Sequence, residues 1–194
     1  MTAMNTIAAP HRLTLAEYKA RPEGLPKCEF ERGALIPMTQ PSPQHQDVLL
    51  VLCYALRGYV RQNKLGRVFM EPDVHLSEDE WYIPDIAYLS DPHMDLYDKA
   101  EKSIHGPPDL VIEITSSRPS RDRVDKFVVY FHHRVAWYWL VDPETLAIEE
   151  YRATADGYLR TASVATGQEF KPSIFPEMAL NLATLLDESP SRES

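Results

Sequence analysis

The sequence predicts a mixed α/β domain with one central β-sheet and helices packed against it. Residues 109–115 are rich in Leu, Val and Ile without polar alternation, which is typical of a strand covered on both faces. Residues 43–66 repeat apolar positions at three- and four-residue steps, which indicates a long amphipathic helix. The predicted elements run helix, hairpin, helix, strands, helix and strands, an order that favours a sheet flanked by helices.

The N-terminal part is predicted to contain a short helix followed by a β-hairpin. Thr14 and Glu17 have the spacing of a capping box, so a helix is expected to begin there. Residues 28–38 comprise two short extended runs on either side of Gly33, a pattern that predicts a hairpin.

The longest helix is expected to begin at Ser42-Pro43, where a capping residue precedes a first-turn proline, and to end at Gly66. Its predicted buried face consists of Val48, Leu49, Leu52, Leu56, Tyr59 and Val60.

The rest of the chain is predicted to alternate mainly between strands and helices. We expect strands at 67–76, 81–89, 109–115, 136–141, 147–152 and 158–164, a short strand near Ile174, a polar helix or loop at 92–106, and helices at 119–133 and 180–186. We expect a single domain over residues 11–187, with flexible tails at 1–10 and 188–194.

Composition restricts the possible partners and compartment. The chain has 194 residues, with 20 Lys and Arg against 29 Asp and Glu, so its net charge is −9. Nucleic-acid binding would therefore depend on a local basic patch or a bound cation. The two cysteines, Cys28 and Cys53, form no disulfide framework, and no apolar run approaches the length of a membrane span. We expect a cytoplasmic protein with no membrane partner.

Two acidic residues lie within apolar strand segments. Glu113 is in the 109–115 strand, and Asp85 follows Pro84 in the strand expected at 81–89. Burying a carboxylate is costly unless it is paired or binds a cation. Because neighbouring strands are about 4.8 Å apart, both carboxylates would reach one hard cation. The alternatives are a buried salt bridge for Glu113 and an edge position for Asp85.

A lysine is available to balance these acids. Lys126 lies in the helix expected at 119–133, with Tyr130 one turn later. Apolar residues nearly encircle this helix, so periodicity does not decide whether Lys126 faces the acids or the solvent. His75, His93 and His105 are scattered in the sequence and lack the spacing of a zinc site.

Several of these segments, in this order, resemble a known family. They are Glu29 with Gly33, residues 43–46, Pro84-Asp85, residues 109–114, Arg121-Asp122 with Lys126 and Tyr130, and residues 138–143. Together they resemble the Uma-two branch of the PD-(D/E)XK nuclease superfamily, a bacterial family described as restriction endonucleases. The resemblance implies a restriction-endonuclease-like central mixed sheet flanked by helices, with an N-terminal β-hairpin.

The resemblance also implies a site and an activity. Asp85 and Glu113 would bind Mg²⁺ or Mn²⁺, and Lys126 would complete the catalytic set. The signature lysine is expected two residues after the second acid, but that position is Thr115, so in this branch Lys126 takes its place from the following helix. Glu29 and His45 would line the cleft.

The implied reaction is metal-dependent hydrolysis of phosphodiester bonds, with DNA as the substrate and a homodimer as the assembly. Arg118, Arg121 and Arg123 are candidates for binding the nucleic-acid backbone. Two alternatives stay open: a catalytically silent nuclease fold used for nucleic-acid binding or self-association, and a hydrolase of small phosphoesters.

Overall fold

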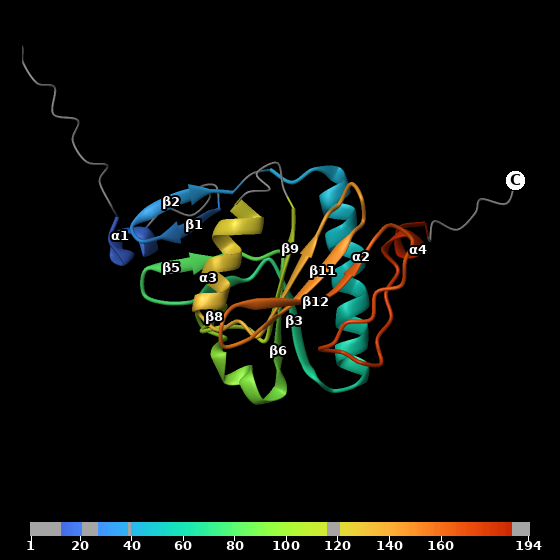
Figure 1. Cartoon of the computed structure of the whole chain (residues 1–194). Helices are drawn as coiled ribbons and strands as arrows, with labels where there is room; N and C mark the ends of the chain where they lie inside the picture. Colours follow the sequence, from blue (N-terminus) through green and yellow to red (C-terminus); the bar gives the residue numbers. More distant parts are fainter. Residues whose placement is uncertain (1–12, 21–26, 39, 116–120, 188–194) are drawn as a thin grey trace, which may run out of the picture.

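The strands of this computed structural model form two mixed six-stranded sheets (Figure 1). Sheet A contains, in spatial order, β2 (Ala34–Pro37), β1 (Cys28–Glu31), β5 (Glu80–Tyr82), β4 (Asp73–His75), β8 (Ser103–His105) and β7 (Tyr97–Asp98). Sheet B contains β12 (Tyr158–Val164), β11 (Ile148–Ala153), β10 (Trp137–Val141), β9 (Leu110–Ile114), β6 (Ile86–Ser90) and β3 (Gly66–Met70). The predicted mixed α/β class with an N-terminal hairpin is confirmed, but the strands divide between two sheets.

The helices lie between and around these strands. They are α1 (Leu15–Lys19), α2 (Pro43–Gln62), the 3-10 helix η1 (Asp91–Leu96), the single-turn π-helix η2 (Arg121–Lys126), α3 (Phe127–His132) and α4 (Leu182–Asp187). The structure describes residues 13–20, 27–38, 40–115 and 121–187, so the tails expected at 1–10 and 188–194 lie outside the described residues. In the described part of the chain, no helix is both long enough and apolar enough to span a membrane.

Two of the predicted strands are each broken into two. The strand expected at 67–76 becomes β3 and β4, because Glu71 between them has a φ of 45°, outside the extended region. The strand expected at 81–89 becomes β5 and β6, and Pro84 between them has no N–H to donate to a ladder. Each break carries the chain from one sheet to the other.

Three other expectations need correction. The region 92–106 contains not only η1 but also the strands β7 and β8. Ile174 lies in a turn and not in a strand, and the nearest pairing is a single bridge between Phe170 and Leu180. Within the helix expected at 119–133, the described part begins at Arg121 as a π-helical turn and ends at His132.

Helix α2 begins where the sequence predicts and ends earlier. The Ser42 hydroxyl accepts a hydrogen bond from the His45 N–H at 3.2 Å, which caps the first turn. The helix ends at Gln62, not at Gly66. A Cβ on Gly66 would lie 2.1 Å from the carbonyl oxygen of Leu89, so glycine is required there by close strand packing.

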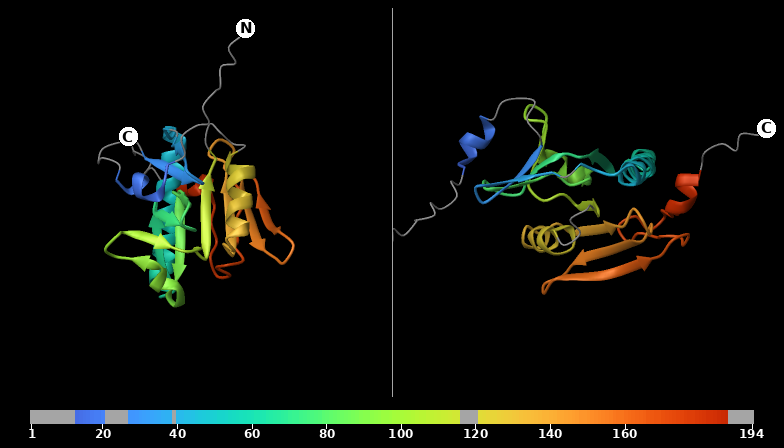
Figure 2. Two further views of the ribbon diagram at one scale, coloured as in Figure 1. Left: turned by 90° about the vertical axis from the view of Figure 1, so that its left-hand side faces the viewer. Right: turned by 90° about the horizontal axis from the view of Figure 1, so that it is seen from above.

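Sheet B separates two apolar clusters. One face packs against α2 through Ile112 and Ile114, and the opposite face packs against α3 through Val111. Figure 2 shows the β1–β2 hairpin and the β11–β12 hairpin on opposite sides of the molecule. All five residues of β9 are buried, which confirms the strand covered on both faces.

One buried acid has a purely structural setting. Glu150 on β11 is fully buried, and its carboxylate accepts bonds from the Trp139 indole N–H at 3.1 Å, the Thr161 hydroxyl at 2.7 Å and the Ser173 N–H at 3.0 Å. These neutral donors satisfy the carboxylate without a cation.

We expect Glu150→Ala to lower the free energy of unfolding by about 2–4 kcal/mol, because it leaves several buried donors unsatisfied. Urea denaturation followed by circular dichroism measures the change. Glu149→Ala is the control. Glu149 precedes Glu150 and pairs with the exposed Arg160, so this variant should lose clearly less unfolding free energy. An equal loss in the two variants would contradict the structural role assigned to Glu150.

Candidate functional site

Two acids meet where β6 and β9 pair. The strands are antiparallel with Ile86 opposite Ile112, so Asp85, just before β6, lies beside the end of β9 that carries Glu113. Strand β6 lies between β9 and β3, so Asp85 stands at the start of a central strand and not on an edge strand. Glu113 alternates with the buried Ile112 and therefore points with Val111 toward the α3 side of the sheet.

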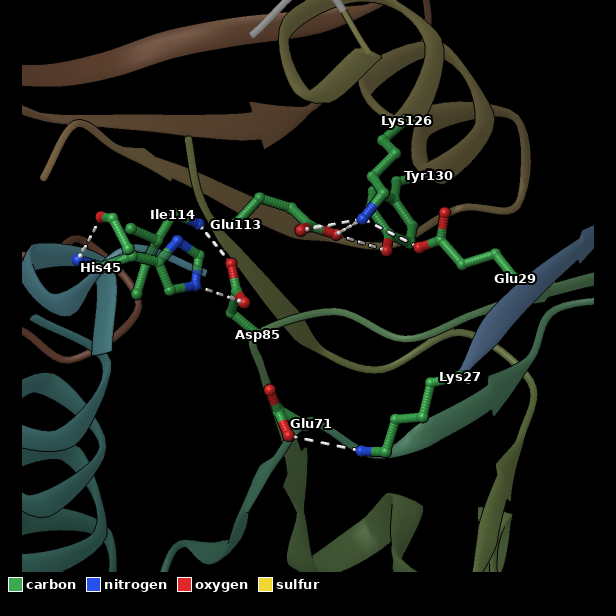
Figure 3. A network of polar contacts seen from close by, with 10 residues as sticks. Lys27, Glu29, His45, Glu71, Asp85, Glu113, Ile114, Lys126 and Tyr130 are labelled. Carbon is green, nitrogen blue, oxygen red and sulfur yellow. Dashed lines mark hydrogen bonds and ion pairs between the residues drawn. The ribbon is translucent and has the colours of Figure 1, made fainter. Parts of the chain in front are cut away.

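Glu113 belongs to a buried network that joins two helical and two strand segments (Figure 3). The Lys126 ammonium donates to both carboxylate oxygens of Glu113 at 3.0 Å and forms an ion pair with Glu29 at 2.9 Å. The Tyr130 hydroxyl donates to Glu113 at 2.8 Å. Glu29 also accepts a long bond, 3.4 Å, from the Ile83 N–H. Lys126 therefore faces the acids and not the solvent.

The local sequence explains how Lys126 and Tyr130 reach the same carboxylate. Lys126 ends the π-helix η2 and Tyr130 lies in α3, four residues later, so both side chains are on one face. Inserted π-helical turns are frequent at functional sites. The hydrophobic residues around α3 hold this face against sheet B, with Tyr130 fully buried.

Asp85 has separate partners. Its carboxylate accepts the Ile114 N–H at 2.6 Å and lies 3.0 Å from His45 Nε2, at the start of α2 (Figure 3). Its backbone carbonyl accepts the Glu71 N–H at 2.9 Å, and the Glu71 side chain pairs with Lys27 at 3.3 Å. These contacts fix Asp85 between the N-terminus of α2 and the end of β9.

Burial affects the electrostatics of this cluster. The side chains of Glu29, Glu113, Lys126, Asp85 and His45 are all buried. Tyr130 stays a neutral phenol, because burial raises its pKa well above the usual value and the nearby carboxylates of Glu113 and Glu29 raise it further. It can therefore act as a hydrogen-bond donor to Glu113 throughout the physiological pH range.

Carboxylates are the main polar groups among the described side chains of this cluster. Glu29, Asp85 and Glu113 lie here with the ammonium of Lys126 and the imidazole of His45. Glu150, by contrast, is satisfied by neutral donors. Carboxylate oxygens are the ligands that a hard divalent cation prefers. The donor set of Asp85 and Glu113 thus fits Mg²⁺ or Mn²⁺.

Most candidates named from the sequence are assembled here. The structure brings together Asp85, Glu113, Lys126, Glu29 and His45. The salt bridge considered as an alternative for Glu113 is present as its pair with Lys126. The three arginine candidates are not placed: Arg118 and the side chains of Arg121 and Arg123 lie outside the described residues.

Sequence reasoning assigned no role to three contributors. Tyr130, which it noted only as the residue one turn after Lys126, donates directly to Glu113. The Ile114 N–H binds Asp85, but backbone groups leave no mark in a sequence. The Glu71 N–H binds the Asp85 carbonyl only because the breaks between β3 and β4 and between β5 and β6 bring the two residues together.

A family model described as "Putative restriction endonuclease" and named Uma2 matches residues 15–183. The chain belongs to the Uma2 family. The predicted family resemblance is confirmed, and membership supports a nuclease-like function.

A solved structure supports the same fold. The protein is similar to the crystal structure of a putative nuclease belonging to DUF820 from Anabaena variabilis ATCC 29413, with 22% sequence identity and a TM-score of 0.70. The match covers 90% of this chain and 99% of that one. At this identity the likeness shows a shared fold. No match was found among curated proteins.

We expect Lys126→Met to lower the free energy of unfolding by about 3–5 kcal/mol, because it removes the buried ammonium that pairs with two buried carboxylates. Urea denaturation in the absence of divalent metal measures the loss. Lys171→Met removes an ammonium from an exposed pair with Glu169 and should leave the urea midpoint unchanged. Equal stability of the wild type and Lys126→Met would contradict the buried network.

Proposed function

We propose that the protein is a metal-dependent endonuclease that hydrolyses phosphodiester bonds in DNA. The observation that carries the proposal is that Asp85, just before β6, and Glu113, in the adjoining strand β9, are both buried at the junction of the two strands, with Lys126 bound to Glu113. Buried, densely packed ionisable groups of this kind are candidates for functional sites.

Asp85 and Glu113 would hold the divalent ion, Mg²⁺ or Mn²⁺. When bound, such an ion polarises a phosphoryl oxygen and lowers the pKa of a coordinated water. The His45 imidazole and the Ile114 N–H hold the Asp85 carboxylate in one orientation, and the Tyr130 hydroxyl does the same for Glu113. Both acids are thus positioned before any ligand arrives, which lowers the cost of reorganisation.

Lys126 supplies a positive charge next to Glu113. Its ammonium lies between Glu113 and Glu29, at 3.0 Å and 2.9 Å, so either carboxylate keeps it in the site if the other changes partner. In the proposed reaction this ammonium orients the attacking water and stabilises negative charge developing on the phosphoryl oxygens. Glu29 is then a positioning residue that acts through Lys126.

Substrate binding must overcome a net charge of −9. The bound cation would supply positive charge where the scissile phosphate lies, and Arg118, Arg121 and Arg123 are the proposed contacts to the flanking backbone. We also propose a cytoplasmic location, because Cys28 and Cys53 are buried free thiols, as expected in a reducing compartment.

We expect the purified protein to cleave plasmid and linear DNA with Mg²⁺ or Mn²⁺, and expect Asp85→Asn and Glu113→Gln each to lower the rate about 100-fold or more. Agarose-gel assays measure the rate, and circular dichroism checks the fold of each variant. Asp109→Asn is the matched control: Asp109 accepts bonds from Ser90 and His93 just before β9 and should keep near wild-type cleavage.

The outcome separates two functions. A second candidate, a catalytically silent module, is favoured by one observation: the Lys126 ammonium already engages both oxygens of Glu113, a pair that could serve stability alone. DNA binding without cleavage in any metal would support this module. Equal cleavage by the wild type and Asp85→Asn would contradict the proposed active site.

We further propose that the protein is a homodimer formed through an exposed stripe of α2. The stripe consists of Asp47, Leu50, Tyr54, Arg57, Gly58 and Arg61. Leu50 and Tyr54 are 63% and 81% exposed, which is unusual for large apolar side chains.

The stripe is complementary to itself. In an antiparallel pair of α2 helices centred on Tyr54, Asp47 of one copy faces Arg61 of the other, and Leu50 faces Gly58. An added Cβ on Gly58 would meet nothing within 4 Å, so this position leaves open space for a partner side chain. A two-fold interface requires this kind of reciprocal matching.

We expect size-exclusion chromatography with light scattering to give twice the 22.2 kDa mass of one chain. Tyr54→Glu and Asp47→Arg should shift the protein toward monomer, and the double variant Asp47→Arg/Arg61→Asp should restore the dimer by reversing both charges. Leu159→Glu, at an exposed apolar residue of β12, is the control and should stay dimeric. A monomeric wild type would contradict this proposal.

A further inference from the structure

Sheet A contains a cluster of potential metal ligands that shares no residue with the candidate active site. Strands β4 and β8 pair in parallel with His75 directly opposite His105. Glu101 precedes His105 by four residues. One ligand atom from each of these three side chains lies within 4.8 Å of the other two.

Nothing in the sequence predicts this cluster, because His75 and His105 are far apart in the chain and do not have zinc-like spacing. The parallel pairing of two three-residue strands brings them together, with ring centroids 4.6 Å apart. Neither strand was predicted as a separate element.

His75 is held in place by its neighbours. Its ring stacks on the Trp81 indole, with centroids 3.5 Å apart and planes inclined by 11°. The Trp81 N–H donates to the Ser77 carbonyl at 3.0 Å, which fixes the indole in turn. These contacts fix the orientation of the His75 imidazole beside His105.

His105 and Glu101 are more exposed and already approach each other. His105 Nε2 lies 3.4 Å from a Glu101 carboxylate oxygen and 2.9 Å from the Ser103 hydroxyl. The other Glu101 oxygen is 3.7 Å from the Lys19 ammonium, which also lies 5.2 Å from the Trp81 ring centroid. His105 and Glu101 are thus exposed, and a metal ion would replace their contact with each other.

We propose that His75, His105 and Glu101 form a binding site for Zn²⁺. Two imidazole nitrogens and one carboxylate are a ligand set that zinc uses in proteins, with a fourth position left for water. Mg²⁺ prefers oxygen ligands, so the site is selective against the ion proposed for Asp85 and Glu113. Zinc would join two short strands to the turn before β8 and stabilise sheet A by binding only the folded chain.

The test is isothermal titration with Zn²⁺ in a chain carrying Asp85→Asn and Glu113→Gln, which removes the other carboxylate pair. We expect one zinc per chain, no competition from Mg²⁺, and a rise in melting temperature on zinc addition. His105→Ala and Glu101→Gln should each weaken binding more than about tenfold, since even outer-shell changes cost that much. His132→Ala, at the exposed last residue of α3, is the control and should leave binding unchanged.

A second measurement does not depend on the variants folding. Co²⁺ added to the wild-type chain with saturating Mg²⁺ should give the visible absorption of a four-coordinate cobalt site, and Zn²⁺ should abolish it. Absence of stoichiometric zinc binding, or the same affinity in His105→Ala and Glu101→Gln as in the parent, would overturn the proposal. Either result leaves the proposed nuclease function unaffected, because the two sites share no ligand.

Discussion

The burial of three carboxylates with one ammonium is the constraint on which the rest of this structure depends. Charged groups withdrawn from water are tolerated only when other charges and hydrogen bonds replace the solvent. Here Lys126 and Tyr130 serve Glu113, while His45 and the Ile114 N–H serve Asp85. The elements that carry these groups must therefore pack around the junction of β6 and β9.

This constraint gives a physical account of the displaced lysine. Thr115 occupies the position two residues after Glu113 and, by strand alternation, lies on the same side of the sheet. An ammonium approaching from α3 reaches the Glu113 carboxylate from that same side. The Lys126 ammonium thus lies on the side of the sheet where a lysine at position 115 would place its charge, although Lys126 belongs to another element. Lys126 is the last residue of the π-helical turn η2.

The sequence predicted those features whose cause is local. The capping box at Thr14, the hairpin around Gly33 and the start of α2 depend on residues close together in the chain, and all three are present. Glu113 was predicted as a site residue for the same reason, since an acid within an apolar run is visible in the local sequence. The direction of Lys126 was not predictable, because apolar residues nearly encircle α3 and only the packing against sheet B decides it.

Features that depend on long-range pairing escaped prediction. The chain crosses between two sheets at Glu71 and again near Pro84, and neither crossing is encoded by periodicity. The parallel register of β4 and β8 places His75 opposite His105 by the same kind of non-local contact. A buried backbone donor such as Ile114 N–H leaves no signal in a sequence at all.

The central claim is that Asp85 and Glu113 share one divalent cation. A crystal soaked in Mn²⁺, with anomalous diffraction data collected at a wavelength where manganese scatters strongly, tests it directly and distinguishes this site from any other on the molecule. The account predicts an anomalous peak in contact with oxygens of both carboxylates. A map with no peak there, in a crystal whose Lys126 ammonium still bridges Glu113 and Glu29, would contradict it.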